Sequence, residues 1–445
     1  MSPMIDHGSD ARTARVRALD PLGADRACQE LRARNAAGDV AGTAAALRGL
    51  VPALRDVETY SVDESLAAMR DLGIFLGSLK RHGTEPLTVA PEALPVLTEL
   101  GRRTGMVPRD TVHHYCTWNP RGARARMYTG DPQEGHLQES VRMVFPGLRD
   151  ALEAGSALAE TDPFDPRFAL LTDELGSLLE CMVDSITMVV DRVDPVWFAR
   201  VLRPYFEEIT VDGRVLLGPA AAQVPLWLID QLVWASDHAE PAYAEFLRDS
   251  VPYSLPRWRA FFGHWSAVPS LVTRLVECYG DDPYAAELRY PQLRRSAESL
   301  LRMLRVVIVF RGRHLGLARQ AYEAEVRLYS VGSGGAGVDL LREILDLTRQ
   351  TVRMTGHIGH TGPTGAGRRD CGHAVPRTRP RTTARQGKGQ GKGQGQATTP
   401  QNPAMAPAIA AAPAPSARPQ GAASVSAPVP APVPALNGKE APWTS

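Results

Sequence analysis

Residues 303–327 read MLRVVIVFRGRHLGLARQAYEAEVR, and this stretch indicates the fold class most directly. Val307, Phe310 and Leu317 recur at the three- to four-residue spacing that places side chains on one face of an α-helix. Residues 177–193, SLLECMVDSITMVVDRV, repeat that periodicity. Both stretches therefore predict long helices that bury one apolar face.

The rest of the chain up to residue 356 shows the same kind of pattern. Leu66, Met69, Leu72 and Leu76 mark another amphipathic helix, and prolines and glycines separate such segments. The exception is residues 210–217, where Asp-Gly between short apolar runs favours a β-hairpin. Strands and helices do not alternate regularly, so we expect an all-α protein, a large helical bundle, and not a doubly wound sheet.

His314 lies within the apolar face of the helix expected at 303–327. Phe310 and Ala318, four residues away on either side, share that face. One interpretation is a core histidine that a neighbouring group satisfies. The other is a neutral imidazole that binds haem iron, with the apolar face covering the porphyrin. Arg311, one turn earlier, would then pair with a haem propionate, or else it is a solvated arginine.

A glycine-rich segment, GSGGAG at 332–337, follows this helix. It fits the GxGxxG pattern of dinucleotide sites, but that motif requires a preceding strand within a βαβ unit, and a helix is expected here instead. Glycines also let backbone N–H groups approach a ligand closely, and a following helix start favours an anion such as a carboxylate.

Composition and charge limit the class of protein. The 445 residues are 44% hydrophobic and carry a net charge of +1. Residues 357–445 hold a basic excess, so the body is net negative and unsuited to tight binding of nucleic acid. The five cysteines are scattered, and we find no secretory signal and no apolar run long enough to span a membrane. We expect a cytoplasmic protein in a reducing compartment.

Three parts are expected along the chain. Residues 1–20 form a flexible polar arm, residues 21–356 form the helical domain, and residues 357–445 form a disordered tail rich in Gly, Pro, Ala and Gln. The tail contains His357, His360, Cys371 and His373, but their spacing matches no standard zinc pattern. We interpret them as scattered residues in a tail that is dispensable for folding.

The order of a helical His314, a Gly-Ser-Gly-Gly loop and an aliphatic helix resembles the C-terminal part of the indoleamine and tryptophan 2,3-dioxygenase haem superfamily. Within it, the monodechloroaminopyrrolnitrin synthase family is most similar, over roughly residues 60–355. Three further segments carry the likeness: 130–140 (GDPQEGHLQES), 193–205 (VDPVWFARVLRPY) and 218–223 (GPAAAQ).

The resemblance implies haem b with His314 as the axial ligand, and an amino-acid substrate that reacts with oxygen or peroxide. In the substrate pocket, Arg203 matches the arginine that binds the substrate carboxylate, and Phe198 matches its aromatic partner. Ser140 matches a pocket serine, whereas His136 stands where indoleamine dioxygenases carry phenylalanine, which argues against simple ring dioxygenation. The remaining candidates are Tyr322, Ser333 and Gly334 toward the substrate, with Ala221 beside the haem.

Each of these residues has a structural alternative. Arg203 would otherwise form a salt bridge, Phe198 would pack in the core, the serines would cap helices, and His136 would lie at the surface. The expected function is oxidation or rearrangement of tryptophan or a halogenated tryptophan in specialised-metabolite biosynthesis. The alternatives are a haem-dependent hydroxylase of another amino acid, such as arginine, and a haem or amino-acid binding protein without turnover.

Overall fold

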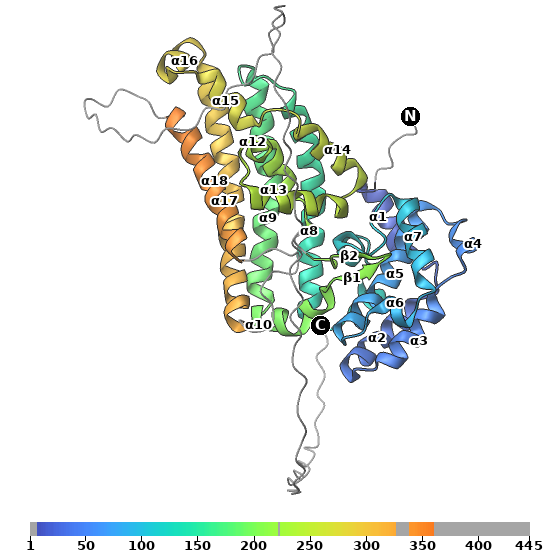
Figure 1. Ribbon diagram of the computed structural model, residues 1–445. Coiled ribbons are helices and arrows are strands. Elements are labelled where there is room, and N and C mark those ends of the chain that lie inside the picture. The colour runs from blue at the N-terminus through green and yellow to red at the C-terminus, as the bar shows by residue number, and fades with distance from the viewer. Residues whose placement is uncertain (1–6, 221–222, 326–337, 360–445) are drawn as a thin grey trace, which may run out of the picture. The chain divides into compact units, whose positions relative to one another are not determined.

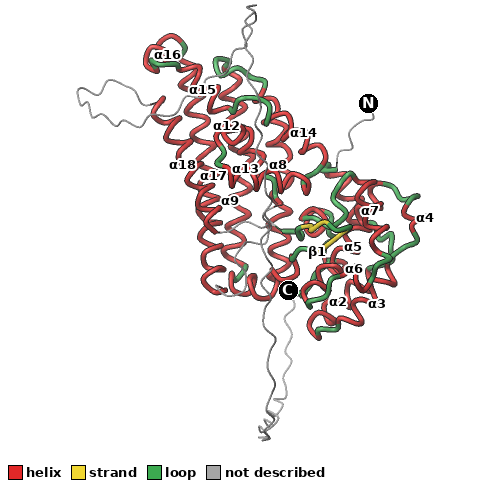
Figure 2. The backbone as a smooth tube through the Cα atoms, viewed as in Figure 1, coloured by secondary structure: helices red, strands yellow, loops and turns green. Residues whose placement is uncertain are grey.

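Helices dominate the computed structural model of the chain, which describes residues 7–220, 223–325 and 338–359 (Figure 1). In those ranges, the strands are β1 (Ile209–Val211) and β2 (Arg214–Leu216), drawn in yellow in Figure 2. The prediction of an all-α protein is therefore confirmed. All described residues belong to one unit, Met1–Gly367.

The α-helices that precede residue 110 are α1 (Asp10–Ala18), α2 (Asp25–Ala37), α3 (Val40–Leu50), α4 (Leu54–Val57), α5 (Val62–Arg81), α6 (Pro86–Val89) and α7 (Ala93–Thr104). Those that follow are α8 (Pro132–Ala159), α9 (Pro166–Arg192), α10 (Pro195–Trp197), α11 (Leu226–Asp230), α12 (Ser236–His238), α13 (Pro241–Ser250), α14 (Pro256–Trp265), α15 (Leu271–Tyr279), α16 (Pro283–Arg289), α17 (Pro291–Glu325) and α18 (Val338–Gly359). Short π- and 3₁₀-helical turns are η1 (His113–Thr117), η2 (Gly122–Arg124), η3 (Phe198–Leu202), η4 (Arg203–Phe206), η6 (Gln231–Ala235) and η7 (Val251–Tyr253).

Four long helices form the bundle that carries His314. Helix α9 packs along both α8 and α17, and α18 packs along the other side of α17 (Figure 1). The predicted stripe on α9 is buried at Leu179, Met182 and Ile186. Asp165 caps the start of α9 by accepting a hydrogen bond from the backbone N–H of Arg167, and Pro195 follows its end. The apolar periodicity, the Asp165 cap and the proline after the last turn together define where this helix begins and ends.

Helix α5 is the centre of the N-terminal helices. Its residues from Ser65 to Leu79 are buried on every side, and Ser61 with Glu64 forms a capping box at its start. Two arginines, Arg70 and Arg126, pair with the buried carboxylate of Asp71. The helix contacts α1, α2, α3, α7 and the turns η1 and η4.

The predicted hairpin is confirmed. Ile209 pairs with Leu216 and Val211 pairs with Arg214 in antiparallel register. Asp212 and Gly213 both have positive φ, at 49° and 70°. Left-handed conformations at both central residues match the twist of a tight hairpin, which explains the Asp-Gly pair.

The prediction of a flexible arm over residues 1–20 is wrong for residues 10–18. These form α1, whose Thr13 and Val16 are buried, and Arg12 and Arg15 both pair with Asp63 on α5. A single apolar residue, Val16, among charged residues gives too weak a periodic pattern to predict this helix. At the other end, α18 runs to Gly359, past the expected start of the tail, and residues 360–445 lie outside the described residues. Among the described helices, none has the length and apolar character that crossing a membrane requires.

Candidate functional site

His314 lies on α17, where its ring is 5.7 Å from the ring of Phe310. The side chain is half-buried. Burial, assisted by the positive charge of Arg311, lowers the pKa of His314 to about 4. The imidazole is therefore neutral at physiological pH, which is the form that can donate a nitrogen lone pair to a metal.

A second, smaller apolar cluster lies at the edge of the main core, on the helix face beside His314. Its buried centre consists of Ile186, Val189 and Val193. Five partly buried side chains pack against that centre. They are Leu137 of α8, Trp197 of α10, Phe198 of η3, and Phe310 and Leu317 of α17. The cluster therefore joins α8, α9, η3 and α17, the segments to which the sequence assigned His136, Phe198 and His314.

The two polar candidates on α8 differ in environment. Ser140 is buried, and its hydroxyl donates to the backbone carbonyl of Leu137 at 2.8 Å. Its own carbonyl accepts a hydrogen bond from the Ser185 hydroxyl on α9, also at 2.8 Å. His136 is half-buried and directly precedes Leu137 of the second apolar cluster. Ser140 thus tightens the contact between α8 and α9, and the roles of both residues toward a ligand stay predictions.

Glu134 fixes the start of α8, a role that was not predicted from the sequence. Its buried carboxylate accepts a hydrogen bond from the Tyr115 hydroxyl at 2.7 Å and from the backbone N–H groups of Tyr128 and Thr129 at 2.6 and 2.8 Å. A carboxylate in the first helical turn that also accepts hydrogen bonds from the preceding loop fixes the orientation of the helix relative to that loop. The preceding run Tyr-Thr-Gly-Asp-Pro, residues 128–132, is the sequence feature that indicates a loop leading into a helix.

Phe198 and Arg203 begin two consecutive irregular turns. Phe198 starts the π-helical turn η3, and Arg203 starts the 3₁₀ turn η4, with Pro204 next in the chain. Both side chains are half-buried. Phe198 also approaches Phe206 at the end of η4, with ring centroids 6.5 Å apart. Turns of the π type are frequent at functional sites, but η1 and η6 are π-helical too, so the irregularity by itself does not mark this site.

Arg311 lies in a buried polar network. Its guanidinium pairs with Asp230 on α11 and donates to the Thr348 hydroxyl on α18. The same carboxylate accepts hydrogen bonds from Tyr243 and from the Trp234 indole. Arg311 is therefore not a solvated arginine, and a haem propionate would have to replace one of these partners.

Asp230 was not predicted from the sequence as that partner. The available signal was a lone acid within the apolar run LWLIDQLVWA at 226–235, because a buried carboxylate requires a cation or several donors.

Several candidates lie outside the described residues. These are Ala221, Ser333, Gly334 and the side chain of Tyr322, whose backbone belongs to the end of α17. The loop around Ala221 is described at both ends. The Gln223 amide donates to the carbonyl of Gly218 at 2.8 Å and accepts from the N–H of Val112 at 2.9 Å.

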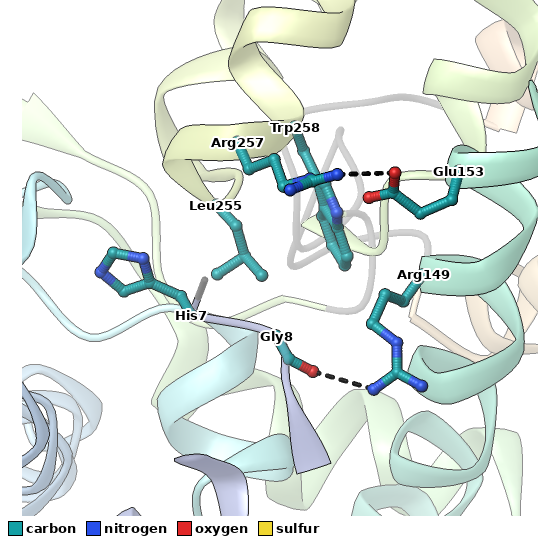
Figure 3. A pocket seen from close by; sticks show the side chains of 7 residues that line it. All are labelled: His7, Gly8, Arg149, Glu153, Leu255, Arg257 and Trp258. Carbon is teal, nitrogen blue, oxygen red and sulfur yellow. Dashed lines mark hydrogen bonds and ion pairs between the residues drawn. The ribbon is translucent and has the colours of Figure 1, made fainter. Parts of the chain in front are cut away.

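A pocket of about 220 Å³ opens elsewhere, between α8 and α14 (Figure 3). Its lining includes Arg149, Arg257, Glu153 and Trp258 but none of the candidate site residues. Arg257 pairs with Glu153, and Arg149 donates to the carbonyl of Gly8. Arg149 also pairs with Asp10 and Asp150, so each charged group of the lining already has a partner, and we place no part of the candidate site in this pocket.

Comparison with known families identifies the family to which the chain belongs. The model of the family described as monodechloroaminopyrrolnitrin synthase PrnB matches residues 38–358. The matched range covers most of the described residues and includes every candidate site residue, from His136 to Gly334. It also contains the bundle, the turns η3 and η4, and the second apolar cluster. The chain therefore belongs to the monodechloroaminopyrrolnitrin synthase family.

Proposed function

We propose that the protein is a haem-dependent oxidoreductase that acts on tryptophan or a halogenated tryptophan in specialised-metabolite biosynthesis. The observation that carries the proposal is the position of His314, a neutral imidazole beside an apolar cluster that joins the candidate segments on α8, η3 and α17. Membership of a synthase family supports a catalytic role.

The residues around His314 fit a haem. Porphyrin needs an apolar wall, and the second apolar cluster offers Leu137, Val189 and Leu317 from three separate elements. Iron needs an imidazole that is not protonated, and His314 is neutral above about pH 4. When bound, haem would supply the activation of oxygen or peroxide that amino-acid side chains cannot perform.

Arg311 is proposed to fix the rotation of α17 and hence the direction of His314. Both residues lie on one helix, one turn apart, and the buried contacts of Arg311 with Asp230 and Thr348 connect α17 to α11 and α18. A metal ligand works best when neighbouring hydrogen bonds and packing hold its orientation, because a mobile imidazole binds iron less tightly.

The substrate would be recognised through its carboxylate and its ring. A planar guanidinium holds a carboxylate through two parallel hydrogen bonds, which is the role proposed for Arg203. Phe198 would form a flat wall against the indole. Ser140, Ser333, Gly334 and Tyr322 are proposed to contact the substrate, and His136 to move a proton during rearrangement.

An optical spectrum of the purified protein tests this proposal. We expect an absorption band of b-type haem at about one haem per chain, and a change in that band when tryptophan is added. Titration with arginine is the control for the alternative hydroxylase. Protein that reconstitutes with haem but gives the same spectrum with and without either amino acid would contradict the proposed substrate class, and protein that binds no haem would contradict the whole proposal.

A further inference from the structure

The turn that begins at Arg203 lies directly against α5 at a glycine. A Cβ atom built on Gly77 would lie 2.7 Å from the backbone oxygen of Tyr205 and 2.5 Å from the hydroxyl of Tyr128. Real Cβ atoms essentially never come closer than 3.0 Å to such neighbours. The backbone of η4 can therefore approach α5 this closely only because residue 77 has no side chain.

A second glycine lies one helical turn earlier on the same face of α5. A Cβ atom on Gly73 would lie 2.3 Å from the Cβ and Cγ atoms of Asp110. We call Gly73 and Gly77 together the glycine seat. Its two positions receive different parts of the protein, since Gly73 accommodates the Asp110 side chain and only Gly77 contacts the Arg203 turn.

Other contacts hold the same turn from different directions. The Tyr128 ring stacks on Tyr205 with centroids 4.5 Å apart. The buried Arg109 donates to the backbone carbonyls of Glu207 at 2.7 Å and Leu216 at 2.5 Å. The chain after Arg203 is thus fixed on α5 through Tyr205 and at both ends of the hairpin through Arg109. Arg203 itself stands at the start of this fixed turn with a half-buried side chain.

We propose that Gly77 is a positioning residue that sets the distance of the Arg203 turn from α5 and thereby determines how well the pocket recognises a substrate carboxylate. The inference rests on the proposed role of Arg203. A methyl group at residue 77 would clash with both the Tyr128 hydroxyl and the Tyr205 backbone oxygen, so the turn at Tyr205 must move away from α5 to admit it. Two parallel hydrogen bonds depend steeply on geometry, and a displacement of about 1 Å can reduce a rate about a hundredfold.

Two alanine variants of the full chain test the inference. Gly77→Ala displaces the turn, and Gly49→Ala, the matched control, adds a methyl group to α3 with nothing within 4 Å. Two readouts are compared. One is the affinity for tryptophan and for indole, which lacks the carboxylate, followed by the haem band. The other is backbone hydrogen exchange over residues 203–217, which requires no haem.

For Gly77→Ala we expect tryptophan affinity to fall about tenfold and indole affinity to change less than about twofold, because the geometry of the carboxylate contact is what changes. Hydrogen exchange over 203–217 should also become faster. Gly49→Ala should leave the ratio of tryptophan to indole affinity unchanged. If Gly77→Ala does not fold, Arg109→Lys replaces it, since lysine cannot bridge two carbonyls and should produce the same selective loss.

The outcomes separate this inference from the proposed function. A selective loss of tryptophan affinity in Arg203→Ala but not in Gly77→Ala would overturn the role of Gly77 and leave the clamp intact. A selective loss in Gly77→Ala without one in Arg203→Ala would overturn the link between the two residues. If neither variant distinguishes tryptophan from indole, the clamp itself fails, and the inference fails with it.

Discussion

Helix α17 and the segment from Asp194 to Leu217 both carry candidate site residues, but different interactions hold them. Helix α17 packs lengthwise on α9 and α18, and its buried face includes Leu300, Leu304 and Val307. The segment from Asp194 consists of short turns and a hairpin. It packs on the core through Tyr205, Phe206 and Ile209. Hydrogen bonds to distant residues hold it as well, since Arg109 donates to the Glu207 carbonyl and the Leu217 N–H donates to the Tyr253 hydroxyl.

The difference separates two parts of the proposed chemistry. The proposed metal ligand lies on the regular helix, where many apolar contacts fix it, and the proposed substrate clamp lies on the irregular segment. Damage to α17 should therefore affect haem binding and stability. Damage to the segment should affect selectivity among ligands and leave haem binding intact.

Replacing His314 should produce the largest effect. We expect His314→Ala to lose most of its haem, because the protein then offers no imidazole to the iron at this site. His238→Ala, at an exposed position on α12, is the matched control and should keep its haem. The haem content of purified full-length protein measures both. Normal haem content in His314→Ala would identify another residue as the ligand.

Breaking the buried pair beside His314 should cost stability. Asp230→Asn leaves the Arg311 guanidinium buried without its carboxylate, and loss of one partner of a buried pair costs about 3–5 kcal/mol in the free energy of unfolding. The control is Asp173→Asn, which removes the partner of Arg302 from an exposed pair in the same bundle. Such exposed pairs contribute about 0–1 kcal/mol. Denaturant unfolding measures both, and equal losses would show that the buried pair does not hold α17.

On the irregular segment, Arg203→Ala should leave haem binding intact and weaken tryptophan binding. A hydrogen bond to a charged group contributes about 1.5–3 kcal/mol, so we expect a loss of about ten- to a hundredfold in affinity. Indole should bind nearly as before because it has no carboxylate. Titration of the haem band with each ligand decides the matter, and parallel losses for both ligands would exclude Arg203 as the clamp.

Removing the chain after Gly359 should produce the smallest effect. Residues 360–445 are rich in Gly, Pro, Ala and Gln, a composition that buries too little apolar surface to offset the entropy of ordering. The shortened protein should keep its haem, and its melting temperature should stay within a few degrees of the full chain. A large drop in that temperature would show that the removed residues pack on the bundle.

The sequence predicts the two regions unequally, for a physical reason. Periodic apolar residues identify α9 and α17, and Asp212-Gly213 identifies the hairpin, because these signals are local. The partners of Arg109 and Arg311 are not local. Asp230 lies 81 residues before Arg311 in the chain, and only the fold brings the two together. The glycine seat was missed for the same reason, since Gly77 inside a helix has no meaning until Tyr205 is known to rest on it.

Chemical rescue tests the central claim, that His314 binds the haem iron, most directly. His314→Gly removes the imidazole and leaves space where it stood, so free imidazole can take its place at the iron. We expect ferrous His314→Gly reconstituted with haem to have an altered spectrum, and added imidazole to restore the spectrum of the unaltered protein. A variant whose spectrum matches the unaltered protein before any imidazole is added would contradict it.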